Sequence, residues 1–357
     1  MAVIAAGCAS DGEGQSGDGS TSERGREDAG SSLTVIDTVD VGGGPLSVAV
    51  DPDGRYAYTA DEKGVSVVDL DRGEMVGTIP MAVGPKEIRL SPDGHQAFVA
   101  SGFIAGAVSF IDTARRRVTG SVAVDGGPLY SLAVSPDGRQ VYAANRGGGV
   151  AVIDTKAREV ETRASLPDAD RGDVVLSRDG RRAYIANSAL GPGGTASKTG
   201  NSVSVFDTAK GTVAARVPVD REMPSDVAIA PDGCCLYVAH FPSMPPPTGF
   251  PEGSSDYAAE QGASNALSVI DAETRTVSDT IPVEGRSTAL AVAPDGRRVY
   301  VGNESGAVQV IDTGSGDVAT TFDVGDDVSG IAIAPDGRHA YVTESQRGKL
   351  HVIELAT

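Results

Sequence analysis

Tryptophan is absent from the 357-residue sequence, and aromatic residues make up only 4 % of it. A buried core must therefore consist mainly of Val, Ile, Leu and Ala. No run of 18 or more apolar residues occurs, so the sequence predicts no membrane-spanning helix. The 30 basic residues are outnumbered by 49 acidic ones, which gives a net charge of −19. Because such an acidic surface repels phosphate backbones, a nucleic acid is not expected as a partner.

Several signatures of catalysis and of cofactor binding are also missing. The sequence contains no Cys-x-x-Cys-His haem attachment motif, no Gly-x-Ser-x-Gly elbow around a nucleophilic serine and no phosphate-binding loop. Three of the four histidines, His95, His339 and His351, lack the spacing of metal ligands. The sequence therefore predicts neither a cofactor nor a metal ion.

What the sequence does contain is a repeat. The stretch Val292–Asn303 recurs seven times with small variations, at a period of roughly 40 residues. Each copy has a turn glycine that is followed four positions later by an aromatic residue: Gly54 and Tyr58, Gly94 and Phe98, Gly138 and Tyr142, Gly180 and Tyr184, Gly233 and Tyr237, Gly296 and Tyr300, Gly337 and Tyr341. In the Pro-Asp-Gly turn, proline fixes φ, aspartate bonds to the turn backbone and glycine adopts a positive φ. Each copy therefore predicts a β-hairpin.

Each repeat divides into four short strands. An apolar strand precedes the turn, the aromatic strand follows it, a third strand ends in an acid such as Asp312, and a fourth leads to the next repeat. The distance from that acid to the next turn glycine is always 25 or 26 residues, whereas the connection between the second and third strands varies in length. The two longest connections, Ser188–Gly200 and Phe241–Ser264, fall on the same face of the predicted sheets, which we call the variable face.

The ends of the repeat region indicate how the sheets close. Residues Thr34–Val41 align with the fourth strand of a repeat, and the last repeat, which ends at Leu350–Leu355, lacks its fourth strand. If the first strand completes the last sheet, both observations are explained and no end of the stack is exposed. We therefore predict an all-β fold, a seven-bladed β-propeller over residues 33–357. The N-terminal outer strand closes it by pairing with the C-terminal three-stranded blade.

The first 32 residues are expected to lie outside the propeller. Residues 1–8 end in a small-small-Cys sequence that resembles the lipobox of bacterial lipoproteins, although the apolar stretch before Cys8 is shorter than in a complete signal peptide. Residues 9–32 are rich in Gly, Ser, Asp and Glu, as a disordered tether would be. We therefore expect lipidation of Cys8, membrane attachment only through that anchor, and an extracytoplasmic protein that is lipid-anchored or secreted.

Three recurring motifs resemble those of the YVTN-repeat β-propellers. They are the Pro-Asp-Gly turn, the Tyr-Ile-Ala-Asn strand at Tyr184–Asn187 and the Val-Ile-Asp-Thr strand at Val152–Thr155 and Val310–Thr313. The resemblance covers residues 33–357. It implies the propeller fold and an extracytoplasmic protein of bacteria or archaea, with relatives that include lactonase-type propellers and the haem d1 domain of nitrite reductases. Because propellers serve unrelated functions, the resemblance implies little about activity.

Candidate functional residues gather on the variable face. Every repeat has a polar residue where its aromatic strand ends: Asp61, Ser101, Asn145, Asn187, His240, Asn303 and Glu344. They could form a ligand-binding ring, or they could simply bond to their own turns. His240 is the best functional candidate among them, because histidine titrates near neutrality and this one opens the longest insertion. That insertion begins with Phe241 and is rich in proline, so it could be a lid, a docking surface or a disordered loop.

The loops that lead into the apolar strands add charged residues to this face: Lys86, Glu87, Asp170, Asp173, Asp226, Arg286 and Asp327. Clustered carboxylates could hold Ca²⁺, but solvated surface acids are the simpler interpretation. Arg89 is unusual because five of the other six apolar strands have alanine at its position. Since an unpaired buried charge is costly, Arg89 should reach the central channel or pair with an acid, and it is a candidate for binding an anion.

Cys234 and Cys235 replace the polar pair that usually follows the turn. Adjacent strand residues point to opposite sides of a sheet, and a disulfide between neighbours is strained. The pair is therefore interpreted either as two thiols or as a vicinal disulfide.

The favoured hypothesis is a monomeric, non-catalytic extracytoplasmic scaffold. It binds an unknown protein or small-molecule partner on the variable face, mainly through the insertions of the fourth and fifth repeats. The candidate ligand-binding residues are His240, Asp226, Asp173, Arg89, Asn187 and Phe241. Two alternatives stay open: a lactonase-like hydrolase with a site at the channel mouth, and an accessory protein of a redox enzyme. Convergence of the first four of these side chains would favour an enzyme.

Overall fold

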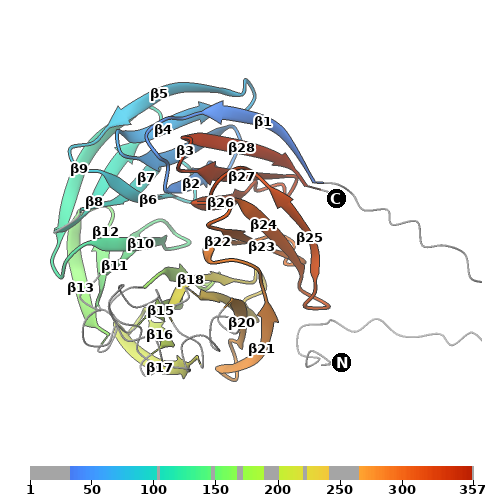
Figure 1. The fold of residues 1–357 in the computed structure, drawn as a ribbon. Coiled ribbons are helices and arrows are strands. Elements are labelled where there is room, and N and C mark those ends of the chain that lie inside the picture. Colours follow the sequence, from blue (N-terminus) through green and yellow to red (C-terminus); the bar gives the residue numbers. More distant parts are fainter. Residues whose placement is uncertain are drawn as a thin grey trace, which may run out of the picture.

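The computed structural model describes residues 33–102, 105–145, 149–166, 172–188, 201–219, 223–240 and 265–355. The regular structure of these residues is entirely β, with 28 strands in seven four-stranded sheets. Figure 1 shows the sheets arranged as blades around a common centre. The predicted seven-bladed β-propeller is confirmed, and the blades are numbered here in the order of their turn glycines.

Each blade is an antiparallel meander that runs from the centre of the ring to its rim. The inner strands are β2 (Ser47–Val50), β6 (Pro85–Leu90), β10 (Leu129–Val134), β14 (Val174–Leu176), β18 (Pro224–Ile229), β22 (Ser287–Val292) and β26 (Gly330–Ile333). The second strands are β3 (Tyr56–Asp61), β7 (Gln96–Ser101), β11 (Gln140–Asn145), β15 (Arg182–Asn187), β19 (Cys235–His240), β23 (Arg298–Asn303) and β27 (His339–Glu344).

The third and fourth strands complete the blades toward the rim. The third strands are β4 (Gly64–Asp69), β8 (Gly106–Asp112), β12 (Gly149–Asp154), β16 (Ser202–Asp207), β20 (Ala266–Asp271), β24 (Ala307–Asp312) and β28 (Lys349–Glu354). The outer strands are β5 (Glu74–Pro80), β9 (Arg117–Val124), β13 (Glu159–Ser165), β17 (Thr212–Pro218), β21 (Thr276–Pro282), β25 (Val318–Asp323) and β1 (Thr34–Asp40).

The turns between the first and second strands have the geometry that the sequence predicts. All seven turn glycines have a positive φ, between 68° and 77°, which an L side chain rarely adopts. In blade 2, the Asp93 carboxylate accepts a hydrogen bond from the backbone N–H of His95 at 3.0 Å. The Ser91 hydroxyl accepts one from the N–H of Gln96, also at 3.0 Å. These bonds fix the register of this hairpin and therefore the direction of its inner strand.

Hydrophobic packing joins each blade to the next. The described residues form seven hydrophobic clusters, and each cluster draws its side chains from two neighbouring blades. Between blades 2 and 3, for example, Phe98 meets Phe110 edge to face, with ring centroids 5.4 Å apart, and both pack with Leu129 and Leu132. Burial of a side chain of this size stabilises the fold by roughly 1.5–3 kcal/mol. Because every cluster spans two blades, no blade has a complete core without its neighbours.

The ring closes in the last blade as the sequence predicts. Strand β1 pairs antiparallel with β28, with Thr34 opposite Glu354 and Val39 opposite Leu350, so the sheet order is β1-β28-β27-β26. Figure 1 shows the blue first strand lying beside the red last strand. The first strand after the N-terminal segment thus completes the sheet that the C-terminus leaves with three strands.

Some expectations fall on residues that the structure does not describe. These are the lipidation of Cys8, the tether at residues 9–32 and, apart from Ser188, the two long insertions with Phe241. None of the described residues belongs to a helix that could cross a membrane.

Shortening a closing side chain should weaken the ring. Val39 is 5 % exposed and packs with Leu350 and Val48, so Val39→Ala should lower the free energy of unfolding by about 2 kcal/mol. Val35 on the same strand is 37 % exposed, and Val35→Ala should change that energy by less than about 0.5 kcal/mol. Urea unfolding of both variants measures the difference, and equal effects would contradict a closing role for the buried side of β1.

Candidate binding site in the central channel

The inner strands of all seven blades surround a cavity of about 850 Å³. Its lining extends from Lys86 and Tyr130, at the variable-face ends of β6 and β10, to Pro136 and Arg178, in turns on the opposite face. The cavity is therefore the central channel of the propeller. Its volume lies within the range of roughly 300–1,000 Å³ that is typical of small-molecule sites.

One position at the start of each inner strand forms a layer around the channel, which we call the girdle. Its seven members all line the cavity: Ser47, Glu87, Ser131, Asp173, Asp226, Ala289 and Gly330. Blades 2, 4 and 5 thus each place a carboxyl group at the same depth. This depth is near the variable face, because the loops of that face lead directly into the inner strands.

Girdle side chains bond to the inner strand of the following blade. The backbone N–H donates to the girdle side chain at four consecutive junctions: Ile88 to Ser47 Oγ (3.5 Å), Leu132 to Glu87 Oε2 (2.6 Å), Val174 to Ser131 Oγ (3.1 Å) and Val227 to Asp173 Oδ2 (3.0 Å). An inner strand is the edge of its sheet, so such an N–H has no further strand to bond to. The girdle supplies the missing acceptor.

The junctions around blade 7 use donors instead of acceptors. Ala289 and Gly330 have no polar side chain, and a Cβ on Gly330 would lie 3.1 Å from the Cα of Ser47, so this junction has no room for one. The neighbouring hydroxyls donate to loop carbonyls of the next blade: Thr288 to Val328 at 2.5 Å and Ser329 to Pro45 at 2.6 Å. Both kinds of junction tie adjacent inner strands together through polar side chains.

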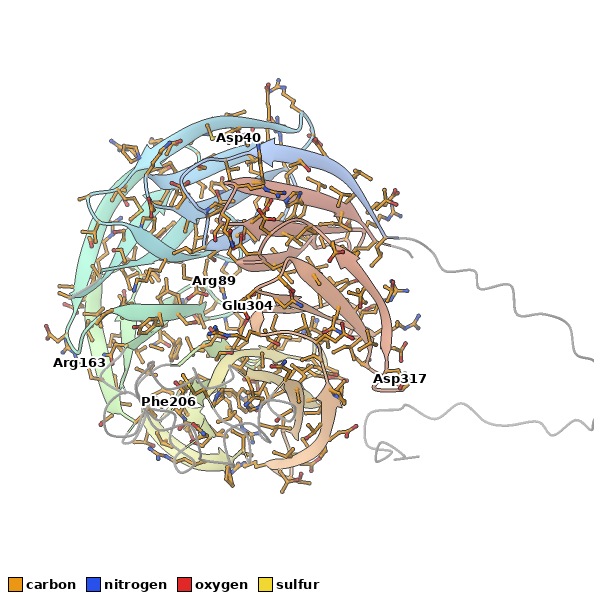
Figure 2. The ribbon with its side chains drawn as sticks, in the orientation of Figure 1. Asp40, Arg89, Arg163, Phe206, Glu304 and Asp317 are labelled. Carbon is orange, nitrogen blue, oxygen red and sulfur yellow. The ribbon has the colours of Figure 1, made fainter. Side chains whose placement is uncertain are left out.

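Arg89 lies two residues beyond the girdle on β6 and points into the middle of the ring (Figure 2). Its guanidinium forms an ion pair with Glu87 and donates to the carbonyl of Ile88 at 3.1 Å. The Arg89 side chain is 39 % exposed, and it lines the cavity, whereas the Glu87 side chain is only 9 % exposed. Arg89 therefore both reaches the channel and pairs with an acid, the two outcomes that the sequence allowed.

Glu87 and Asp226 of the girdle have raised pKa values. Burial raises the pKa of Glu87 to about 7, and the positive charge of Arg89 only partly opposes this. Burial also raises the pKa of Asp226 well above its usual range, and the charge and hydrogen bond of Asp173 raise it further. Burial alone would lower the pKa of Arg89, but Glu87, Asp173 and Asp226 together raise it. At neutral pH Glu87 and Asp226 together therefore carry fewer than two negative charges.

Three of the predicted site residues come together, and the others do not. Arg89, Asp173 and Asp226 share the channel and interact electrostatically. His240 is 1 % exposed, and its Nε2 lies 2.8 Å from Ser268 Oγ inside blade 5. Asn187 is 2 % exposed and donates to Ser204 Oγ at 2.8 Å. Phe241 lies outside the described residues.

The residues that end the second strands are held mainly by bonds within their own blades. All seven are buried. Asn145 Oδ1 accepts from the N–H of Gly149 at 2.9 Å, and Asn303 Oδ1 accepts from that of Ala307 at 3.0 Å. These bonds are the turn chemistry that the sequence offered as the alternative to a ligand-binding ring.

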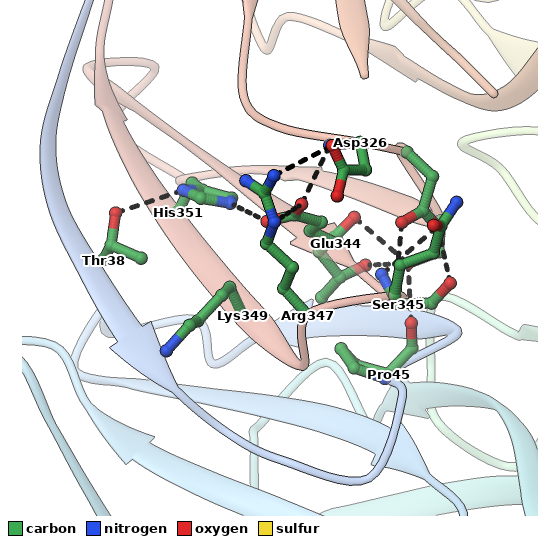
Figure 3. A network of polar contacts seen from close by, with 12 residues as sticks. Thr38, Pro45, Asp326, Glu344, Ser345, Arg347, Lys349 and His351 are labelled. Carbon is green, nitrogen blue, oxygen red and sulfur yellow. Dashed lines mark hydrogen bonds and ion pairs between the residues drawn. The ribbon is translucent and has the colours of Figure 1, made fainter. Parts of the chain in front are cut away.

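Glu344 extends this pattern into the closing blade (Figure 3). Its Oε2 lies 3.0 Å from His351 Nε2, and His351 Nδ1 lies 3.1 Å from the Thr38 hydroxyl of β1. Arg347 pairs with Glu344 at 3.5 Å and with Asp326 at 2.9 Å. The network connects β27, β28 and β1, so it supports ring closure.

Glu87, Arg89, Asp173 and Asp226 together form a group that we call the channel cluster. Sequence reasoning undervalued Glu87 among these four residues. It appeared only among the charged residues of the variable-face loops. A usable signal existed, since Glu87 and Asp226 each stand five residues before the turn proline, at Pro92 and Pro231. Aligning the repeats on that proline would have placed the two acids at equivalent positions.

The channel geometry belongs to a fold that is found elsewhere. No family model matches the chain, and no curated protein is detectably similar to it in sequence. A solved structure from Kuenenia stuttgartiensis, titled hydrazine synthase, is similar with a TM-score of 0.74 and 22 % sequence identity. The similarity covers 88 % of this chain and 96 % of that one. The protein is a seven-bladed β-propeller. At this identity the likeness shows the fold alone.

The raised pKa of Glu87 predicts that stability falls as the pH increases. Between its usual pKa of 4.5 and about 7, the folded protein binds this proton more tightly than the unfolded chain does. The protonated Glu87 therefore contributes to the free energy of unfolding. This contribution is complete below pH 4.5 and is lost by about pH 7, which lowers the free energy of unfolding by about 3 kcal/mol. Glu87→Gln should remove that part of the slope in urea unfolding between pH 4.5 and 8. Asp226 should leave a residual slope of the same sign.

The exposed Glu74 of β5 provides the matched control, because Glu74→Gln should preserve the wild-type pH dependence. A Glu87→Gln variant with an unchanged slope would contradict the assignment.

Proposed function

We propose that the protein is an extracytoplasmic scaffold that binds a small organic cation, such as an amine or a guanidine, in the channel near the variable face. The observation that carries this proposal is the channel cluster, in which Glu87, Asp173 and Asp226 surround the guanidinium of Arg89. That guanidinium is already paired with Glu87. Because three carboxyl groups face this one guanidinium, the cluster favours a cationic ligand over the anion that Arg89 alone suggested.

The surroundings of the cluster suit a small polar molecule. Hydroxyl groups of Ser225, Ser287, Thr288 and Ser329 line the same cavity. At its variable-face end, Lys86 Nζ lies 4.8 Å from the centroid of the Tyr130 ring. Such a mixture of a few charged groups, hydroxyls and an aromatic ring can orient a ligand without a reaction.

The cellular setting is proposed from the sequence. Lipidation of Cys8 and the tether at residues 9–32 would place the propeller outside the cytoplasm as an anchored or secreted monomer. A neighbouring protein would dock on the insertions of blades 4 and 5, which the sequence predicts on the variable face. The likeness to a chain titled hydrazine synthase supports only the fold, so a role as an accessory of a redox enzyme stays a prediction of the sequence.

One observation favours a second candidate, the lactonase-like hydrolase. A carboxyl with a pKa near 7 beside a guanidinium, inside a cavity, is an arrangement that general acid–base catalysis uses. Turnover of a lactone panel that Glu87→Gln abolishes would support the hydrolase over the scaffold.

Calorimetric titration tests the binding proposal. At pH 8, putrescine and agmatine should bind to the wild-type protein, whereas succinate of similar size should not. Asp226→Asn removes a carboxyl group that a bound cation would hold in its ionised form, so it should weaken amine binding at least tenfold, equivalent to about 1.4 kcal/mol. Arg89→Ala should leave amine binding unchanged or strengthen it, because it removes a competing cation.

Asp295 provides the control, because it lies in an exposed turn. Asp295→Asn should bind amines as the wild type does. Binding of succinate that Arg89→Ala abolishes, with no binding of amines, would overturn the proposal in favour of an anion site.

A further inference from the structure

The turn of blade 5 carries two adjacent cysteines where the other blades carry polar side chains. The equivalent pairs are Arg55–Tyr56, His95–Gln96, Arg139–Gln140, Arg181–Arg182, Arg297–Arg298 and Arg338–His339. Six copies of the same hairpin therefore form without a thiol at either position. The fold does not require Cys234 and Cys235, so their presence needs another explanation.

The structure places the two thiols together. Their sulfur atoms are 3.0 Å apart, and both residues are partly exposed. Strand alternation had predicted side chains on opposite sides. Cys234 still belongs to the turn, however, and β19 begins only at Cys235, so the alternation does not apply to the pair.

We propose that Cys234 and Cys235 form a reversible redox site that closes to a vicinal disulfide by exchange with a low-molecular-weight disulfide. One cysteine, as its thiolate, attacks a sulfur of the external disulfide and releases one small thiol. The second cysteine then attacks the mixed disulfide and releases the other. The two cysteines are oxidised, the external disulfide is reduced to two thiols, and the two protons end on those thiols.

The site is built for reversibility rather than for permanent cross-linking. Closing the bond needs the sulfurs to approach from 3.0 Å to about 2.05 Å. Neighbouring Cα atoms are only about 3.8 Å apart, below the roughly 4.4–6.8 Å of ordinary disulfides, so the closed ring is strained. A strained and accessible disulfide is readily reduced, which is the behaviour of labile and regulatory bonds.

Oxidation would act on the backbone that leads to the channel. The N–H of Ala272 donates to the carbonyl of Cys234, and the N–H of Ala230 donates to that of Cys235, both at 2.9 Å. The peptide group between Cys234 and Cys235, which the closed disulfide would strain, therefore lies between these two hydrogen bonds. Ala230 directly follows β18, the strand that carries Asp226. This inference rests on the thiol geometry and does not depend on what the channel binds.

The experiment uses the full-length protein in mixtures of reduced and oxidised glutathione. Samples are quenched by alkylation, and the tryptic peptide that contains both cysteines is analysed by mass spectrometry. In the oxidising mixtures this peptide should lose the mass of two hydrogen atoms, and both cysteines should become resistant to alkylation together. Dithiothreitol should restore two alkylated cysteines. Cys8 lies in a different tryptic peptide and does not interfere.

Single variants provide the control. Cys234→Ser and Cys235→Ser should each accumulate one glutathione adduct under oxidising conditions, because the resolving thiol is missing. A wild-type peptide that carries two glutathione adducts would overturn the proposal. So would a peptide that remains fully alkylatable in the most oxidising mixture.

Discussion

Pairing of β1 with β28 is the constraint on which the rest of this propeller depends. Every hydrophobic cluster draws on two blades, so an open row of seven blades would leave one face of its first and last members unpacked. Joining a strand from one end of the chain to the sheet at the other end makes the packing circular. The cluster that contains Val39, Val48 and Leu350 exists only because of that closure.

Circular packing also creates the polar channel. Seven inner edges meet at the centre, and their N–H groups need acceptors that water or a further strand would otherwise provide. The girdle meets this need with two serines and with the carboxylates of Glu87 and Asp173. Part of the charge in the channel is therefore structural. Asp226 and Arg89 are not needed as acceptors for these N–H groups. Their presence in the channel therefore supports a role in ligand binding.

The sequence was sufficient for the architecture because its signals are local and repeated. Turn glycines such as Gly94 and the unmatched first strand determine blade number and closure without any distant contact. The channel cluster could not be derived in this way, since Arg89 meets Asp173 and Asp226 only after three blades have been placed around a ring. His240 looked more promising because histidine titrates near neutrality. Its ring is instead committed to Ser268 within its own blade.

Seven copies of one motif also act as internal controls for what the fold demands. At the depth of Arg89 five blades have alanine, and at the cysteine pair six blades have polar side chains. Placing a guanidinium among carboxyls in the channel costs partial desolvation that alanine avoids, and packing thiols at a solvent-facing turn gives no evident gain in stability. Departures of this kind from a pattern that already folds are expected where a protein binds or reacts, because stability alone does not favour them. The channel cluster and the thiol pair are two such departures, carried by different blades.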